Sequence, residues 1–161
     1  MDNELLRSMI SEIEKEIDTI NILRNEMKEI TSIDPIIFRR AMGSILHDFY
    51  TCCERIFKRI AFDVNGGFDE SEKWYKALLF KMTVPIKDIR LAVISEDMAA
   101  ELDEYLSFRH VFRNIYGFEL RSERLVHLSK KFDKAAEIFI QEIKGFVIFL
   151  EKELRKLEEH L

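Results

Sequence analysis

The stretch that decides the fold is the last long one, 122-SERLVHLSKKFDKAAEIFIQEIKGFVIFLEKELRKLEE-159. Its apolar residues recur every three or four positions, the spacing that lines one face of an α-helix. That face consists of Leu125, Leu128, Phe132, Ala135, Phe139, Ile143, Phe146, Leu150, Leu154 and Leu157. The pattern predicts one amphipathic helix from Ser122 to about Glu159, which needs other helices to cover its apolar face.

Two earlier stretches have the same period and clear helix boundaries. Residues 3–30 carry an apolar seam that is interrupted at Arg24. Asp34 suits the N-cap of a second helix and Pro35 its first position, where a missing N–H costs nothing. We expect this helix to run from Pro35 to about Phe62 and to stop at Asn65-Gly66-Gly67, because these residues tolerate the left-handed conformation.

The middle of the chain predicts one short helix and one long one. Asp69-x-x-Glu72 reads as a capping box for a helix from Glu70 to about Met82. Residues 83–94 predict an ordered, partly buried connector, since a lone strand would have no partner. Ser95 caps a fourth long helix that ends or bends at Gly117. The fold class is therefore all-α, an up-down bundle of four long helices plus one short helix.

Composition supports one globular domain spanning residues 1–161. The 47% of hydrophobic residues suffices for a core, and 5 Gly and 2 Pro favour long helices over many strands. A net charge of −5 argues against a broadly basic face, although it permits a local basic patch. The adjacent Cys52 and Cys53 read as free thiols. We find no signal peptide and no apolar run of membrane-spanning length, and therefore expect a cytoplasmic protein without a membrane contact.

The densest polar cluster lies in 108-FRHVFRNIYG-117, on an otherwise apolar helix. Helical geometry places Arg109, Arg113 and Tyr116 near one stripe, with His110 and Asn114 on an adjacent one. Two arginines suit a phosphate, because the guanidinium fork binds its oxygens in pairs. A histidine beside them can move protons near neutral pH. This combination is the minimum needed to cleave RNA without a metal.

A structural interpretation of the same cluster stays open. Either arginine could instead pair with Asp103, Glu104 or Glu119, and His110 could be an ordinary helix residue. His47 would reach the cluster if the second and fourth helices are neighbours.

No His, Asp or Glu set in the sequence has metal-ligand spacing, and there is no Gly-rich phosphate loop. We therefore expect no metal and no cofactor. Residues 139–149 are apolar on more than one face, which predicts a homodimer or partner contact.

Arg109-x4-Asn114-x-Tyr116 resembles the Arg-x4-6-His motif, followed by x-Tyr, of HEPN-domain proteins. Over residues 35–150 the chain resembles the HepT-like branch in particular. The other pieces that match in order are Leu46-His47-Asp48-Phe49-Tyr50, Glu54-Arg55-Ile56-Phe57, Trp74 before Leu78-Leu79 and Met82, and Tyr105-Leu106-Ser107-Phe108-Arg109-His110. The resemblance implies a dimeric helical bundle with a composite ribonuclease site. It also implies a toxin–antitoxin pair whose minimal nucleotidyltransferase antitoxin can add AMP to Tyr116.

The sequence departs from this motif at its histidine. Asn114 occupies that position, and an amide is neither an acid nor a base at pH 7. Either His110 takes over proton transfer, or the protein binds RNA or a partner without cutting. The first hypothesis is a metal-independent endoribonuclease in which Arg109 and Arg113 clamp the phosphate, His110 is the acid/base and Asn114 orients the phosphate or the 2′-hydroxyl. The alternative is a non-catalytic module that dimerises and binds a nucleotidyltransferase or another regulator.

Overall fold

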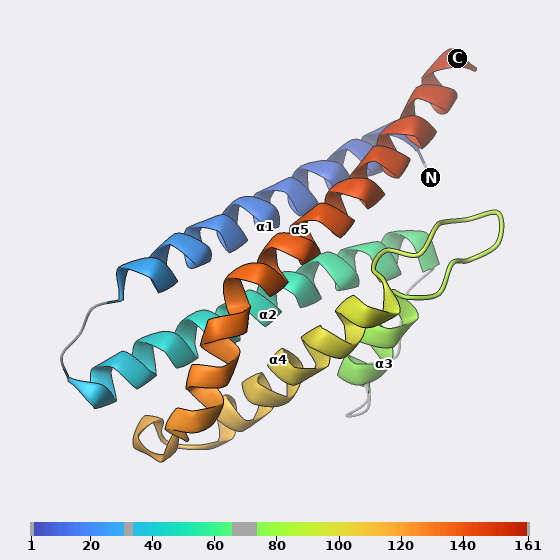
Figure 1. Cartoon of the computed structure of the whole chain (residues 1–161). Coiled ribbons are helices and arrows are strands. Elements are labelled where there is room, and N and C mark those ends of the chain that lie inside the picture. Colours follow the sequence, from blue (N-terminus) through green and yellow to red (C-terminus); the bar gives the residue numbers. More distant parts are fainter. Residues whose placement is uncertain (1, 31–33, 66–73, 161) are drawn as a thin grey trace.

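A computed structural model describes residues 2–30, 34–65 and 74–160, without the side chains of residues 63–65 and 118. The helices are α1 (Asn3–Glu29), α2 (Pro35–Asn65), α3 (Trp74–Lys81), α4 (Glu96–Asn114), the short 3-10 helix η1 (Gly117–Glu119) and α5 (Ser122–Glu159). The four long helices alternate in direction along the chain (Figure 1). This arrangement confirms the predicted up-down bundle. The described ranges contain no strand, only one isolated bridge between Ile86 and Arg90.

Local side chains fix where α2 and α4 begin. The predicted caps are confirmed, since Asp34 Oδ1 accepts the Ile36 amide hydrogen at 2.8 Å and Ser95 Oγ accepts that of Met98 at 3.1 Å. At its other end α4 stops at Asn114, three residues before Gly117, and Gly117 begins η1 instead. The predicted stop at Gly66-Gly67 and the capping box at Asp69 and Glu72 lie outside the described residues.

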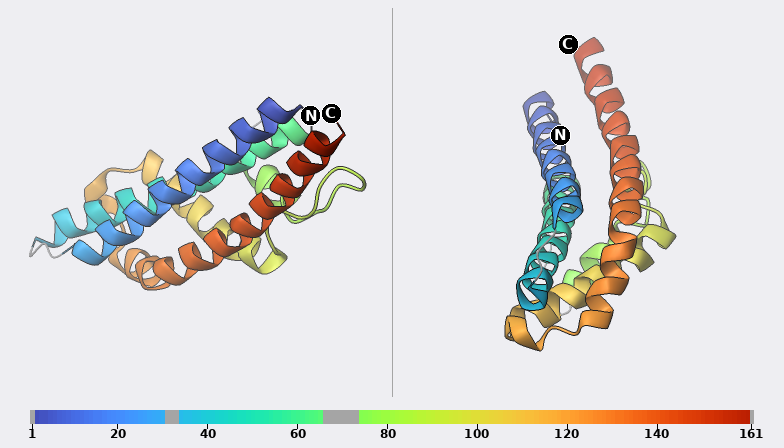
Figure 2. Two further views of the ribbon diagram at one scale, coloured as in Figure 1. Left: turned by 90° about the horizontal axis from the view of Figure 1, so that it is seen from above. Right: turned by 60° about the vertical axis from the view of Figure 1, so that its left-hand side comes forward.

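The core lies between α1, α2, α4 and α5, each of which packs against two or more of the others (Figure 2). At its centre the Phe49 ring meets the edges or faces of three other rings. Its centroid lies 5.2 Å from that of Tyr105, 5.1 Å from Phe132 and 6.2 Å from Phe139. The two α5 phenylalanines belong to the apolar face that the sequence predicted. No helix in the described ranges is long and apolar enough to cross a membrane.

Arg24, which interrupts the apolar seam of α1, forms an ion pair with α5. Arg24 Nε donates to Asp133 Oδ1 of α5 at 2.8 Å, so the two helices are joined by charge where the seam lacks an apolar residue. The hydrogen bond from Arg24 holds the pKa of the Asp133 carboxyl below its usual value. The polar break therefore fixes how α1 and α5 align.

The connector between α3 and α4 is ordered, as predicted, and is built around one buried arginine. The Arg90 guanidinium donates to the carbonyl oxygens of Val84 at 2.9 Å, Leu91 at 3.0 Å and Lys81 at 3.2 Å. A guanidinium has several donors in a fixed geometry, so one arginine can hold carbonyl groups from separate parts of the connector. This role of Arg90 could not be predicted from the sequence, since it depends on the path of the backbone.

The second apolar surface expected on α5 is mostly covered within the chain. Of the residues between 139 and 149, Phe139, Phe146 and Val147 are buried, and Phe149 is partly buried against the core. Ile148 is 52% exposed. Because other helices of the same chain bury most of this face, it offers a small outer apolar surface and not a broad one.

Candidate functional site

The predicted polar cluster divides into a buried part and an exposed part, and Arg109 belongs to the buried one. Its side chain is 3% exposed and forms an ion pair with Glu54 of α2. The guanidinium carbon lies 4.8 Å from the ring centroid of Tyr50 and 5.7 Å from that of Tyr75. Nη1 is buried without a hydrogen-bond partner among the described residues. The ion-pair partner of Arg109 is thus on α2 and is none of the acids predicted near it on α4 and η1.

The other oxygen of Glu54 extends this pair into a small charged network. Lys58 Nζ lies 3.1 Å from Glu54 Oε1, one helical turn further along α2. The same ammonium lies 4.8 Å from the ring centroid of Trp74 on α3. Three helices therefore meet at one buried carboxylate, which fixes α4 against α2. The Glu54–Lys58 spacing was visible in the sequence, but the contact with Arg109 was not.

Arg113 points to the exposed side of the same helix pair and meets His47. Arg113 Nε donates to His47 Nε2 at 3.0 Å, and His47 Nδ1 lies 3.0 Å from Asp48 Oδ1. The expectation that His47 would reach the cluster if α2 and α4 are neighbours is confirmed. Guanidinium only donates and carboxylate only accepts, so the proton of a neutral His47 sits on Nδ1 and Nε2 carries a lone pair. The Phe112 ring, 5.3 Å from the imidazole, packs beside it.

The remaining predicted residues lie at the end of α4. The His110 side chain is exposed, and its imidazole makes no hydrogen bond or ion pair with the described residues. Asn114 Nδ2 donates to the backbone oxygen of His110 at 2.7 Å, so the amide at the motif position is held by its own helix. Tyr116, just beyond the helix, is 71% exposed. The exposed groups are thus the side chains of His110, Arg113, Asn114 and Tyr116, and the partly buried His47 lies against Arg113.

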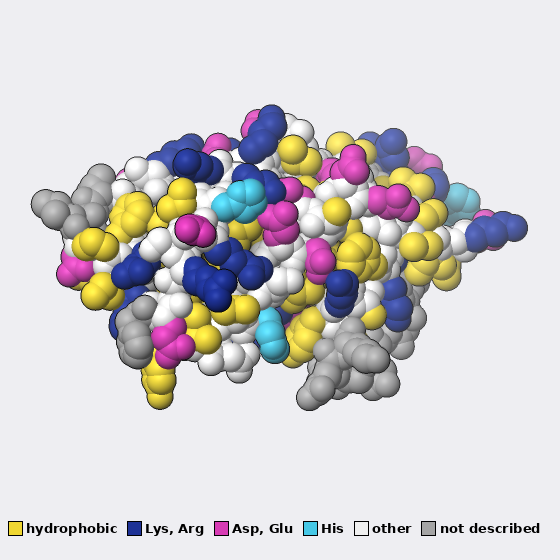
Figure 3. All heavy atoms as spheres, turned by 60° about the horizontal axis from the view of Figure 1, so that its bottom comes forward, with side chains coloured by type: hydrophobic (Ala, Val, Ile, Leu, Met, Phe, Trp, Pro, Cys, Tyr) yellow, Lys and Arg dark blue, Asp and Glu magenta, His cyan; other side chains and the backbone are white. Residues whose placement is uncertain are grey.

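A residue that the sequence did not single out, Arg40 of α2, joins this face. Its side chain packs over Gly117, where an added β-carbon would lie 2.7 Å from Arg40 Nε. Gly43 lies about one turn further along α2, and a β-carbon added there would lie 2.9 Å from the Phe112 ring. The space-filling view shows Lys and Arg side chains gathered, with a histidine on either side, toward the end of the bundle where α4 finishes (Figure 3). Although the protein is acidic overall, it thus has a local cationic surface, which includes Arg40 and Arg113.

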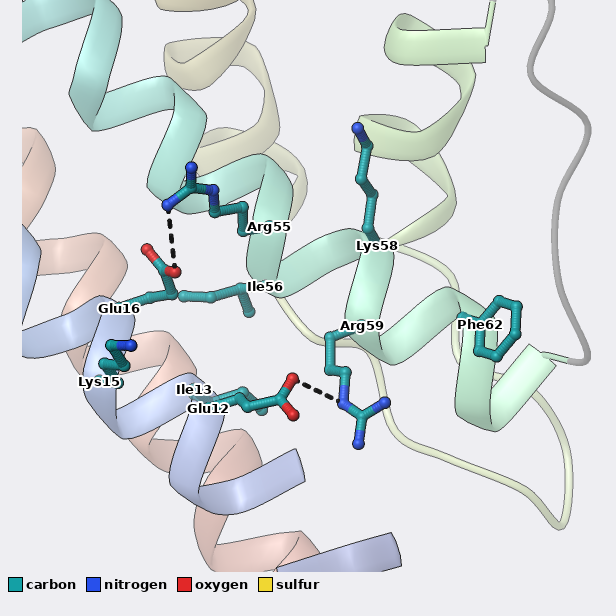
Figure 4. Close-up of a pocket in the computed structure, with 9 residues that line it drawn as sticks. All are labelled: Glu12, Ile13, Lys15, Glu16, Arg55, Ile56, Lys58, Arg59 and Phe62. Carbon is teal, nitrogen blue, oxygen red and sulfur yellow. Dashed lines mark ion pairs between the residues drawn. The ribbon is translucent and has the colours of Figure 1, made fainter. Parts of the chain in front are cut away.

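Other locations are poorer candidates. A pocket of about 440 Å³ opens between α1 and α2, but its arginines face glutamates across it (Figure 4). Arg59 Nε lies 2.9 Å from Glu12 Oε2, and Arg55 Nη1 lies 3.7 Å from Glu16 Oε1. The described residues contain no group of His, Cys, Asp and Glu able to hold a metal.

The cysteines do not supply a nucleophile either. Burial raises the pKa of the Cys52 thiol to about 12, and Cys53 is completely buried. Because the thiolate is the reactive form, neither side chain is suited to attack a substrate.

Comparison with known proteins identifies the family. No curated protein and no solved structure matches the chain. A family model described as HepT-like protein matches residues 41–150, from α2 through most of α5. This range contains both the buried Glu54–Arg109 pair and the exposed pair of Arg113 and His47. Because the match covers more than half of the sequence and the fold is the expected helical bundle, the chain belongs to the HepT-like branch of the HEPN superfamily.

Proposed function

We propose that this HepT-like chain is one half of a toxin–antitoxin pair and cleaves RNA without a metal. The observation that carries the proposal is the contact between Arg113 and His47, with Asp48 behind the imidazole. An imidazole oriented by a carboxylate is the usual arrangement of a general base. The arginine beside it suits the phosphate on which that base would act.

The proposed reaction uses groups on both helices. When the Arg113 guanidinium turns to a phosphate, His47 Nε2 is released and takes the proton of the neighbouring 2′-hydroxyl. The 2′-oxygen attacks phosphorus, the bond to the 5′-oxygen breaks, and His110 as an imidazolium protonates that leaving oxygen. Arg113 stabilises the negative charge that develops on the phosphate. The products are a 2′,3′-cyclic phosphate and a 5′-hydroxyl.

Arg109 and Asn114 take indirect parts in this scheme. Buried against Glu54, Arg109 holds α4 on α2 so that Arg113 faces His47 one turn later. The Asn114 amide nitrogen is bound to the His110 carbonyl, which leaves its oxygen available to orient the 2′-hydroxyl. The imidazole expected at position 114 is thus replaced by one from α2.

Family resemblance adds a homodimer to the proposal. In such a dimer the cationic surfaces of two chains face each other and share one RNA strand. Sedimentation of the purified protein tests this part, with a dimer expected at micromolar concentration and a persistent monomer arguing against a composite site.

The cleavage is tested with purified protein and single-stranded RNA in the presence of a metal chelator. We expect His47→Ala, His110→Ala and Arg113→Ala each to slow cleavage by about 100-fold or more, since a positioned acid or base contributes about that much. His160→Ala is the matched control, because this histidine is exposed at the far end of α5. Absence of cleavage by the wild type, or cleavage unchanged by all three variants, would refute the proposal.

The surroundings of Arg109 and Asn114, the two residues at the motif positions, favour a second function. Arg109 is buried and Asn114 is held by its own helix, as expected if the site no longer cuts. The chain would then be a non-catalytic module that binds a nucleotidyltransferase. That partner would transfer AMP from ATP to the Tyr116 oxygen, releasing pyrophosphate. Mass spectrometry after incubation with such an enzyme and ATP decides this function, with modification of wild type and none of Tyr116→Phe as the expected result.

A further inference from the structure

Beside the proposed cleavage site, a second pair of exposed residues has the chemistry of a nucleotide subsite. Tyr116 is 71% exposed, more than any other aromatic side chain among the described residues. Arg40 approaches the backbone of the next residue, Gly117, so the arginine and the tyrosine belong to one small area of surface. Aromatic rings and arginines together are the common means of binding single-stranded nucleic acid.

Arg40 and Tyr116 are separate from the cleavage site, but Arg40 lies on the same face of α2 as His47. Arg40 and His47 are seven residues apart on α2, which places them on the same face with about 10 Å between them along the axis. Arg113 is paired with His47, whereas Arg40 lies against η1. Two cations spaced in this way suit successive phosphates of a strand and not the same phosphate.

We propose that Arg40 and Tyr116 form a subsite for the nucleotide next to the scissile phosphate, with single-stranded RNA as the ligand. This inference rests on the proposed function for its placement. Tyr116 stacks on the base and Arg40 pairs with the adjacent phosphate. An unpaired base is required, because a base inside a duplex offers no free face to the ring. Stacking accepts any base, so the subsite extends affinity along the strand without reading its sequence.

The backbone at Gly117 is part of this subsite. A β-carbon there would come within 2.7 Å of Arg40 Nε and 3.1 Å of its Cγ, so even alanine must displace the arginine. Gly117→Ala therefore disturbs the subsite while it leaves the charge of the protein unchanged.

The test measures binding and cleavage separately. Fluorescence anisotropy follows a short labelled oligouridine whose 2′-hydroxyls are methylated, so that it cannot be cut, and a duplex of matching length serves for comparison. We expect Tyr116→Ala to weaken single-strand binding about fivefold or more, the effect of losing one stacked base. Tyr116→Phe should bind as the wild type does, because the ring remains.

For Arg40 the expected signature is in the salt dependence. Arg40→Ala should lower the slope of log affinity against log salt by about 0.7, the contribution of one phosphate of a single strand. Gly117→Ala should weaken binding in the same direction. Arg155→Ala, which removes an exposed arginine near the C-terminal end of α5, should change neither affinity nor slope. Circular dichroism checks that each variant is folded.

The outcomes distinguish the subsite from the cleavage proposal. Binding that depends on Arg40 and Tyr116, by a protein that cuts no RNA, supports the subsite and refutes cleavage. Cleavage with binding that is indifferent to both residues overturns the subsite alone. Equal affinity for strand and duplex, or no binding of either, also overturns it.

Discussion

Replacing Arg109 by alanine should destabilise the fold strongly, because it breaks a buried ion pair. The substitution leaves the Glu54 carboxylate buried, with Lys58 as its remaining cation. Removing one partner of a buried ion pair typically costs about 3–5 kcal/mol, because the other charge stays desolvated. Since small domains are stable by only about 5–15 kcal/mol, this loss is a large part of the total.

Urea unfolding followed by circular dichroism measures the effect. Arg113→Ala is the matched control, four residues later on the same helix but exposed, and it should cost about 0.5 kcal/mol or less. The double variant Glu54→Leu with Arg109→Met should recover most of the loss, because both charges are then gone. If Arg109→Ala costs no more than Arg113→Ala, the burial of Arg109 against Glu54 is wrong and its guanidinium is open to a phosphate after all.

Three further changes have clear expected results. Gly145→Ala should stabilise α5 by about 0.5–1 kcal/mol in thermal unfolding, since an added β-carbon there meets nothing within 4 Å. Gly43→Ala should destabilise in the same assay, because its β-carbon would lie 2.9 Å from the Phe112 ring, and unchanged stability would contradict the close packing of α2 on α4. The hydrogen bond from Arg24 lowers the Asp133 pKa, so this pair stabilises the fold above the unfolded pKa of about 3.9 and ceases to do so as the pH falls through the lower folded pKa. The free energy of unfolding of Asp133→Asn should therefore depend less on pH between about 5 and 2 than that of the wild type.

Features that depend on local sequence were predictable. The predicted helix from Ser122 to about Glu159 is confirmed, as are the starts of α2 and α4 at Asp34 and Ser95, because each of these signals acts within one or two turns. The sequence predicts that α4 ends or bends at Gly117, whereas the helix ends at Asn114 and the glycine lies beneath the Arg40 side chain.

The sequence predicts which residues belong to the candidate site, but not which contacts they make. Helical geometry placed Arg109 and Arg113 on one stripe. The direction of a long arginine side chain, however, depends on the partner that it binds on a neighbouring helix. Arg109 meets a carboxylate 55 residues earlier in the chain, inside the bundle, and Arg113 meets an imidazole 66 residues earlier, outside it. No periodicity within α4 contains this information, since it depends on the register of α2 against α4.

Because position 114 is an asparagine, the proposed site depends on the register of α2 against α4. In a site whose base and phosphate ligand share one helix, their spacing is fixed by the helix itself. In the site proposed here the base is His47 on α2, and its distance from Arg113 is set by how the two helices pack. The buried Glu54–Arg109 pair lies one to two turns away on both helices and joins them directly. A buried charge pair, which contributes little net stability compared with an apolar contact, is well suited to specifying such a register. The double variant that restores stability without the charges should therefore still cleave RNA poorly, because it keeps the fold and loses the alignment of His47 with Arg113.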